Sequence, residues 1–210
     1  MNSATQTKRP NPPAKQKLLD AALTVIREKG YTATTVDDLC TKAGVAKGSF
    51  FHHFKDKEAL AIAAADYWSE MTGGFFAAAD YHKHSDPLDR VLGYIDLRKQ
   101  ILTGRIADFA CLIGTMIQEV YETHPAIRDA CEASITEHAA KIETDIAAAM
   151  KQHNISADWT ARSLALHTQV VLQGAFILAK AKDITVAAES VDHLRRYVEL
   201  LFRVPTYSKE

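Results

Sequence analysis

Six prolines divide the chain into long proline-free stretches, and this spacing constrains the fold more than any other feature of the sequence. The prolines stand at positions 10, 12, 13, 87, 125 and 205. Because proline disrupts the interior of a helix, each stretch between them can be helical from end to end. Apolar residues recur there at helical spacing, and no stretch alternates as a strand does. The pattern predicts an all-α protein of about nine helices.

Capping residues predict where these helices begin and end. Thr35 and Asp56 are suitable N-caps, Gly30 and Gly44 are suitable C-caps, and Asp86 followed by proline marks another helix start. Residues 81–86 are expected to form a polar loop. The expected helices span residues 14–29, 36–43, 47–54, 57–79, 87–104, 106–122, 125–152, 156 or 158 to 182, and 184–203.

Composition places the chain among folded proteins of a reducing compartment. Its 210 residues, 47% hydrophobic and 24% charged, suffice for one or two domains with a buried core. Cys40, Cys111 and Cys131 are widely spaced and contain no C-x-x-C pair, so neither disulfides nor a zinc ribbon is indicated. The first 13 residues lack the apolar stretch of a signal peptide, and the most apolar run, residues 170–181, is interrupted by Gln173 and Lys180. A cytoplasmic protein that does not enter membranes is expected.

The net charge of −1 is an average over two unlike parts of the chain. Residues 1–60 contain ten Lys and Arg against six Asp and Glu, a balance of +4. Residues 61–210 contain 15 against 20, a balance of −5. Only the first part therefore has the charge expected of a protein that binds a polyanion.

Residues 35–54 have the pattern of a helix-turn-helix, in which the second helix enters the major groove of DNA. Two short helices flank a turn at residues 43–45. The second helix alternates polar side chains with aromatic ones: Lys47, Ser49, His52, His53 and Lys55 against Phe50, Phe51 and Phe54. Aromatic packing alone also accounts for Phe50 and Phe54. Adjacent histidines on a helix point about 100° apart, so His52 and His53 do not predict a metal site.

The same segment resembles the TetR family of transcriptional regulators. The matching runs are Gly30-Tyr31, Thr34-Thr35-Val36-Asp37-Asp38-Leu39, Ala43-Gly44-Val45-Ala46-Lys47-Gly48-Ser49, Phe50-Phe51-His52-His53-Phe54 and Lys55-Asp56-Lys57-Glu58-Ala59-Leu60. The resemblance implies a flexible arm over residues 1–13 that carries Lys8 and Arg9, a DNA-binding domain over 14–60, and a helical effector-binding and dimerisation domain over 61–205.

The resemblance also implies a set of DNA-binding residues. Thr35, Lys47 and Lys55 would contact phosphates, and Gly48, Ser49 and His52 would lie near base edges. Thr34, Phe51 and His53 complete the predicted set. The family usually has a tyrosine at the position of Phe51, whose hydroxyl reaches a phosphate, and Phe51 cannot form that bond.

For residues 61–205 the expectations are coarser. Apolar residues on the last two helices predict a homodimer interface, although the same residues also suit the core of one subunit: Leu164, Val171, Gly174, Leu178, Leu194, Val198 and Leu201. Bulky apolar residues with a few polar ones predict an effector pocket: Trp68, Met71, Phe75, Tyr94, Arg98, Phe109, Cys111, Met116, Gln118 and His167. Cys111 is either a thiol sensor or a small buried apolar residue.

The predicted function is a repressor that binds a palindromic double-stranded DNA operator as a dimer and is released by a small-molecule effector. An activator and a structural DNA-binding protein of the same fold are the alternatives. A helical-bundle enzyme, such as a di-iron protein, is disfavoured because the sequence lacks the paired E-x-x-H motifs that it needs. No cofactor and no metal are expected.

Overall fold

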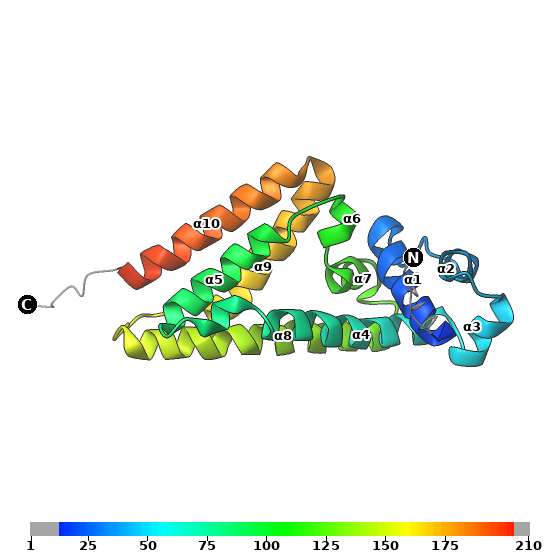
Figure 1. Cartoon of the computed structure of the whole chain (residues 1–210), viewed down its shortest axis with the longest axis horizontal. Coiled ribbons are helices and arrows are strands. Elements are labelled where there is room, and N and C mark those ends of the chain that lie inside the picture. The colour runs from blue at the N-terminus through cyan, green and yellow to red at the C-terminus, as the bar shows by residue number, and fades with distance from the viewer. Residues whose placement is uncertain (1–12, 204–210) are drawn as a thin grey trace, which may run out of the picture.

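The computed structural model describes residues 13–203, apart from the side chain of Arg203, and within this range it is entirely helical (Figure 1). The α-helices are α1 (Ala14–Lys29), α2 (Val36–Ala43), α3 (Lys47–His53), α4 (Lys57–Ala77), α5 (Pro87–Gln100), α6 (Ile106–Phe109), α7 (Leu112–Val120), α8 (Pro125–Gln152), α9 (Ala161–Ala181) and α10 (Ile184–Arg203), with a 3-10 helix, η1, at Asp80–Lys83.

Local capping chemistry explains the boundaries that the sequence predicts correctly. The Thr35 hydroxyl accepts from the Asp38 amide at 3.1 Å, and the Asp38 carboxylate accepts from the Thr35 amide at 2.8 Å, so a capping box begins α2. Gly44 ends α2 in the left-handed conformation. Asp56 and Asp86 each accept a backbone N–H at the starts of α4 and α5.

Four predicted boundaries differ from the structure. The expected helix over 106–122 is broken at Ala110 and Cys111, where the backbone is extended and the Cys111 sulfur caps α7. The connection between α8 and α9 is longer than expected. α9 begins only after Thr160, whose hydroxyl forms its N-cap. Residues 80–83 form η1, which overlaps the expected loop at residues 81–83. α5 ends at Gln100 because the chain turns into Gly104, where φ is +79°.

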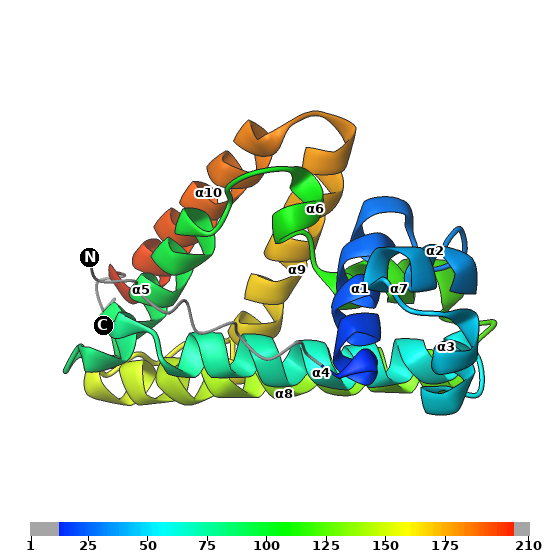
Figure 2. The same ribbon diagram turned by 45° about the vertical axis from the view of Figure 1, so that its right-hand side comes forward.

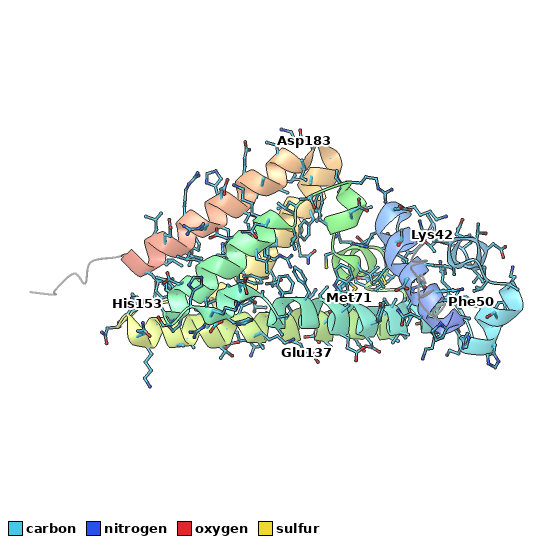
Figure 3. All side chains as sticks on the ribbon, in the orientation of Figure 1. Lys42, Phe50, Met71, Glu137, His153 and Asp183 are labelled. Atoms are coloured by element: carbon cyan, nitrogen blue, oxygen red, sulfur yellow. The ribbon has the colours of Figure 1, made fainter. Side chains whose placement is uncertain are left out.

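The helices form a reading head at one end of a longer helical body (Figures 1 and 2). α1, α2 and α3 make the head, and α4 runs from it along α8 as the base of the body. α9 packs on α8 and α10, and α5 packs between α8 and α10. Figure 3 labels Phe50 in the head and Met71 and Glu137 on the two base helices.

The hydrophobic core of the head extends beyond residue 60. Leu18, Ile26, Leu39 and Phe50 are fully buried, and they share one cluster with residues of α7, among them Met116. A second cluster fills the space between α5, the end of α8, α9 and α10. α7 therefore lies between the two parts, since it packs against α1 of the head and against α8 of the body.

Among the described residues, α9 has the length and apolar composition of a membrane span. About 44% of that stretch is buried inside the fold. Gln169 and Gln173 on the same helix face the interior. Burial and inward polar residues are features of a core helix.

Candidate nucleic-acid interface and ligand cavity

The buried aromatic residues of α3 fix which side chains point outward. Phe50 and Phe54 are buried in the core of the head. Lys47, Gly48 and His52 are consequently exposed, while Ser49 and His53 are half-buried. The outward face combines one fixed positive charge, a hydroxyl and an imidazole around a glycine that leaves open space, a surface suited to the edges of bases and to phosphates.

Phe51 is 52% exposed and its ring contacts Phe50 edge-on at 5.2 Å between centroids. It therefore presents an apolar ring, without a hydroxyl, on the same outward side of the helix. Any phosphate contact at this position has to come from a neighbouring residue.

Thr34 is misassigned as a DNA-binding residue. It is 1% exposed, and its hydroxyl donates to the carbonyl of Gly30 at 2.6 Å. The side chain closes the turn between α1 and α2 and does not reach the surface. Thr35 remains exposed, but its hydroxyl takes part in the capping box, so the backbone at the start of α2 is the group left to meet a phosphate.

Two lysines near the ends of α3 form solvent-exposed ion pairs. Lys47 lies 2.9 Å from Asp37, and Lys55 lies 3.9 Å from Asp56. Hydrogen bonding and attraction to Asp37 raise the pKa of Lys47, so it stays charged. Exposed pairs of this kind contribute little free energy. A phosphate can therefore replace Asp37 as the partner of Lys47.

A cavity of about 170 Å³ lies in the body between α4, α5, α6, α8 and α9. Five of the predicted pocket residues line it: Trp68, Phe75, Arg98, Phe109 and Cys111. Tyr94 lines an adjoining cavity of about 150 Å³. The two cavities share Phe76 and His138 as part of their common wall.

Four predicted pocket residues lie elsewhere. Met71 is exposed on α4 outside the cavity lining. Met116 is fully buried in the core of the head, and exposed Gln118 donates to the carbonyl of Gly114 and lies outside the lining of the main cavity. His167 is exposed on α9 and packs against Tyr197.

The sequence prediction missed the polar residues that α8 and α9 contribute to the cavity. Ser134 and His138 come from α8, and Gln169 and Gln173 come from α9. His138 shares a 2.9 Å hydrogen bond with the Tyr94 hydroxyl, and the Gln169 amide donates to the same hydroxyl at 3.4 Å. Burial, helped by the charges of Arg98 and Lys141, lowers the pKa of His138 to about 4, so the imidazole is neutral at pH 7.

Cys111 differs from the other cysteines in its access to solvent. It is half-buried in the cavity wall, whereas Cys40 and Cys131 are buried. Burial raises the pKa of Cys40 and raises that of Cys131 to about 12, and a thiol reacts only as the thiolate. We expect a maleimide to label one thiol quickly in the native protein and all three after denaturation, as counted by mass spectrometry.

Cys111→Ser should remove the fast phase of labelling. Fast labelling that survives this substitution would contradict the assignment. The sensor hypothesis predicts in addition that maleimide treatment releases DNA from the wild-type protein but not from Cys111→Ser.

Arg27 links the cavity wall to the reading head, and Glu119 links α7 to it. Arg27 on α1 donates to the carbonyl of Asp108 at 3.0 Å and lies over the Trp68 ring at 5.2 Å, and both partners line the cavity. The Glu119 carboxylate on α7 accepts the backbone N–H groups of Tyr31 (3.2 Å) and Thr32 (2.7 Å) after α1. These contacts connect α6 and α7 to α1 and to the turn that follows it.

The predicted dimer stripe is partly buried within the subunit. Leu164, Leu194 and Val198 are 3%, 2% and 0% exposed, so they pack in their own core and cannot meet a partner. Val171, Gly174 and Leu201 are half-buried, and Leu178 is exposed. The surface left open is the α9–α10 face, formed by Leu166, Val170, Ile177, Leu178, Tyr197 and Leu200.

Comparisons with known proteins agree with this architecture. The family described as "Bacterial regulatory proteins, tetR family" matches residues 18–64, and "Tetracyclin repressor-like, C-terminal domain" matches residues 87–196. A crystal structure of a TetR transcriptional regulator from Chloroflexus aurantiacus superposes with a TM-score of 0.76 at 26% identity, covering 89% of this chain and 94% of that one.

Two curated relatives carry regulator names. The transposon Tn10 TetC protein of Escherichia coli is 29% identical over 132 residues, 50% of this chain and 66% of that protein. The transcriptional repressor DhaR of a Mycobacterium species is 27% identical over 117 residues, 55% of this chain and 57% of that protein. The chain spans less than two thirds of the length of either.

The two family matches together cover the head and most of the body. The family consists of DNA-binding regulators of transcription, not of enzymes. The chain belongs to the TetR family of bacterial transcriptional regulators.

Proposed function

We propose that the protein is a cytoplasmic repressor that binds a palindromic operator as a homodimer and is released when a small molecule occupies the cavity. The proposal rests on one observation, that residues in the cavity wall also contact helix α1 of the reading head. Asp108 and Trp68 line the cavity, and both contact Arg27 of the reading head. A ligand that displaces this wall also displaces α1.

Ligand and DNA then affect each other through one equilibrium between two conformations of the protein. If the ligand favours one arrangement of α6 and α7 and the operator favours the other, each must weaken the binding of the other by the same factor. The exposed α9–α10 face supports the dimer, since apolar patches of this kind mark association surfaces. A twofold dimer would place two α3 helices on half-sites about 34–36 Å apart.

Selection of binding sites from a random duplex pool by the purified protein tests DNA recognition without knowledge of the operator. We expect enrichment of an inverted repeat. Equal affinity for the enriched and the starting pool at physiological salt would overturn the proposal. A reporter with the enriched site between its promoter elements then separates the roles, because a repressor lowers expression and an activator raises it.

Lys47→Ala is expected to weaken binding to every DNA sequence by about tenfold and to reduce the salt dependence by about two ions per dimer, because one phosphate contact is lost in each subunit. Fluorescence anisotropy across a series of salt concentrations measures both quantities. Lys151→Ala, which removes an exposed charge at the far end of α8, is the matched control. An unchanged salt dependence in Lys47→Ala would remove this residue from the interface.

A further inference from the structure

Arg98 is the group in the cavity whose bonding is incomplete. It stands in the last turn of α5, and its guanidinium lies 5.3 Å, 5.6 Å and 6.0 Å from the ring centroids of Phe76, Phe176 and Tyr94. Its Nε atom is buried and has no hydrogen-bond partner among residues 13–203. The Arg98 guanidinium therefore lies among aromatic rings, and its Nε has no hydrogen-bond acceptor in the described part of the chain.

Other arginines that are partly buried do have acceptors. Arg27 donates to two backbone carbonyls. Arg90 donates to Asp145 at 2.7 Å, and Arg195 donates to Asp96 at 2.8 Å. The ring faces around Arg98 attract its positive charge, but they offer no oxygen in the plane of its N–H groups.

The acids that line the cavity are not available to Arg98. Asp108 is held by the guanidinium of Arg105 at 3.0 Å and by its backbone N–H at 2.9 Å. Glu137 is exposed on α8. Lys141, which is exposed on α8, adds a second positive charge to the lining, and burial, helped by both cations, lowers the pKa of His138. The two acids of the lining therefore leave the buried Nε of Arg98 without an acceptor.

We propose that the cavity binds a small organic carboxylate, whose oxygens accept hydrogen bonds from the Arg98 guanidinium while its apolar part packs between the aromatic walls. Arginine and carboxylate match in a two-pronged geometry. The volume of about 170 Å³ sets the size, because an apolar cavity of about 150 Å³ holds a benzene molecule. That this acid acts as the effector rests on the function proposed above.

Benzoate and benzamide form a matched pair of probes, because they share size and shape and differ in charge. Isothermal titration calorimetry on the full-length protein is expected to show that benzoate binds and that benzamide binds about 10- to 100-fold more weakly. Arg98→Met should abolish the preference for benzoate, and Arg98→Lys should retain a part of it because the charge remains and the planar fork is lost.

Lys99→Gln is the control for an unspecific loss of positive charge. Lys99 follows Arg98 on α5 but is exposed, pairs with Asp192 at 2.7 Å and lies outside the cavity lining. Benzoate binding should be unchanged in this variant. Thermal unfolding and circular dichroism of each variant establish that it is folded before it is titrated.

Equal binding of the two probes, or unchanged benzoate binding by folded Arg98→Met, would overturn the proposal. So would the absence of binding by benzoate and by each straight-chain acid from butanoate to octanoate at millimolar concentration. If Arg98→Met does not fold, the preference for benzoate over benzamide is compared between the wild-type protein and Arg98→Lys.

Release of DNA is scored separately on the site recovered from the random pool. A carboxylate that binds through Arg98 and leaves the DNA complex intact would contradict the proposed release while supporting the anion site. Sequence-specific DNA binding by a protein that binds none of the acids would support the DNA-binding function and contradict the anion site. The two proposals can therefore fail independently.

Discussion

Val170→Glu is expected to convert the protein from a dimer into a monomer. Val170 is 66% exposed and belongs to the α9–α10 face. Two glutamates would meet or lie close together across a twofold axis there, and burying their charges without partners is strongly unfavourable. The monomer would hold one reading head, so operator affinity should fall by about 100-fold or more, the usual loss when two linked binding sites become one.

Sedimentation velocity measures the oligomeric state, and anisotropy with the selected DNA measures the affinity. Ala147→Glu is the matched control, since it adds the same charge at an exposed position of α8 outside the face. The control should remain a dimer. A Val170→Glu protein that stays dimeric and binds DNA normally would show that subunits associate through another surface.

Acid is expected to destabilise the protein well above the pH at which carboxylates titrate. The pKa of His138 is lowered from its ordinary value of 6.5 to about 4, chiefly by burial. Between these values the unfolded chain binds a proton that the folded protein excludes, so stability is complete above pH 6.5 and falls as the pH drops toward 4. At 1.36 kcal/mol for each pKa unit, the loss by pH 4.5 amounts to about 2.5 kcal/mol.

Urea unfolding at pH 7 and pH 4.5 measures this loss, and His138→Gln should reduce it because a neutral amide can keep the hydrogen bond to Tyr94. The carboxyls of Asp86 and Asp108 have lowered pKa values, so their contribution is lost only as the pH falls below about 4. Equal acid sensitivity in the wild type and in His138→Gln would assign the effect to other groups.

The head could be predicted from the sequence because its signals are local. The capping box of Thr35 and Asp38 and the left-handed Gly44 each depend on residues a few positions apart. The break at Cys111 could not be predicted in this way. A cysteine is an unusual N-cap, and the extended backbone there is accompanied by the contact of Arg27 with the carbonyl of Asp108, which lies 81 positions away in the chain.

The dimer stripe shows a limit of periodicity. Leu164, Val171 and Leu178 are seven residues apart, but a straight α-helix drifts about 20° in each such step. Leu164 is accordingly buried, Val171 half-buried and Leu178 exposed. His138 was missed although a local signal was present, since it lies seven residues after buried Cys131 and four before buried Ile142, on the inward face of α8.

The packing of α7 against the head decides how this protein can be recombined with its relatives. A chimera that exchanges only residues 1–60 would place a foreign α1 against Met116, and Glu119 would meet a foreign turn at Gly30, whose missing side chain leaves room for that carboxylate. A new operator specificity is therefore better grafted as the outward residues of α3 alone. A whole head should be transplanted together with residues 112–120.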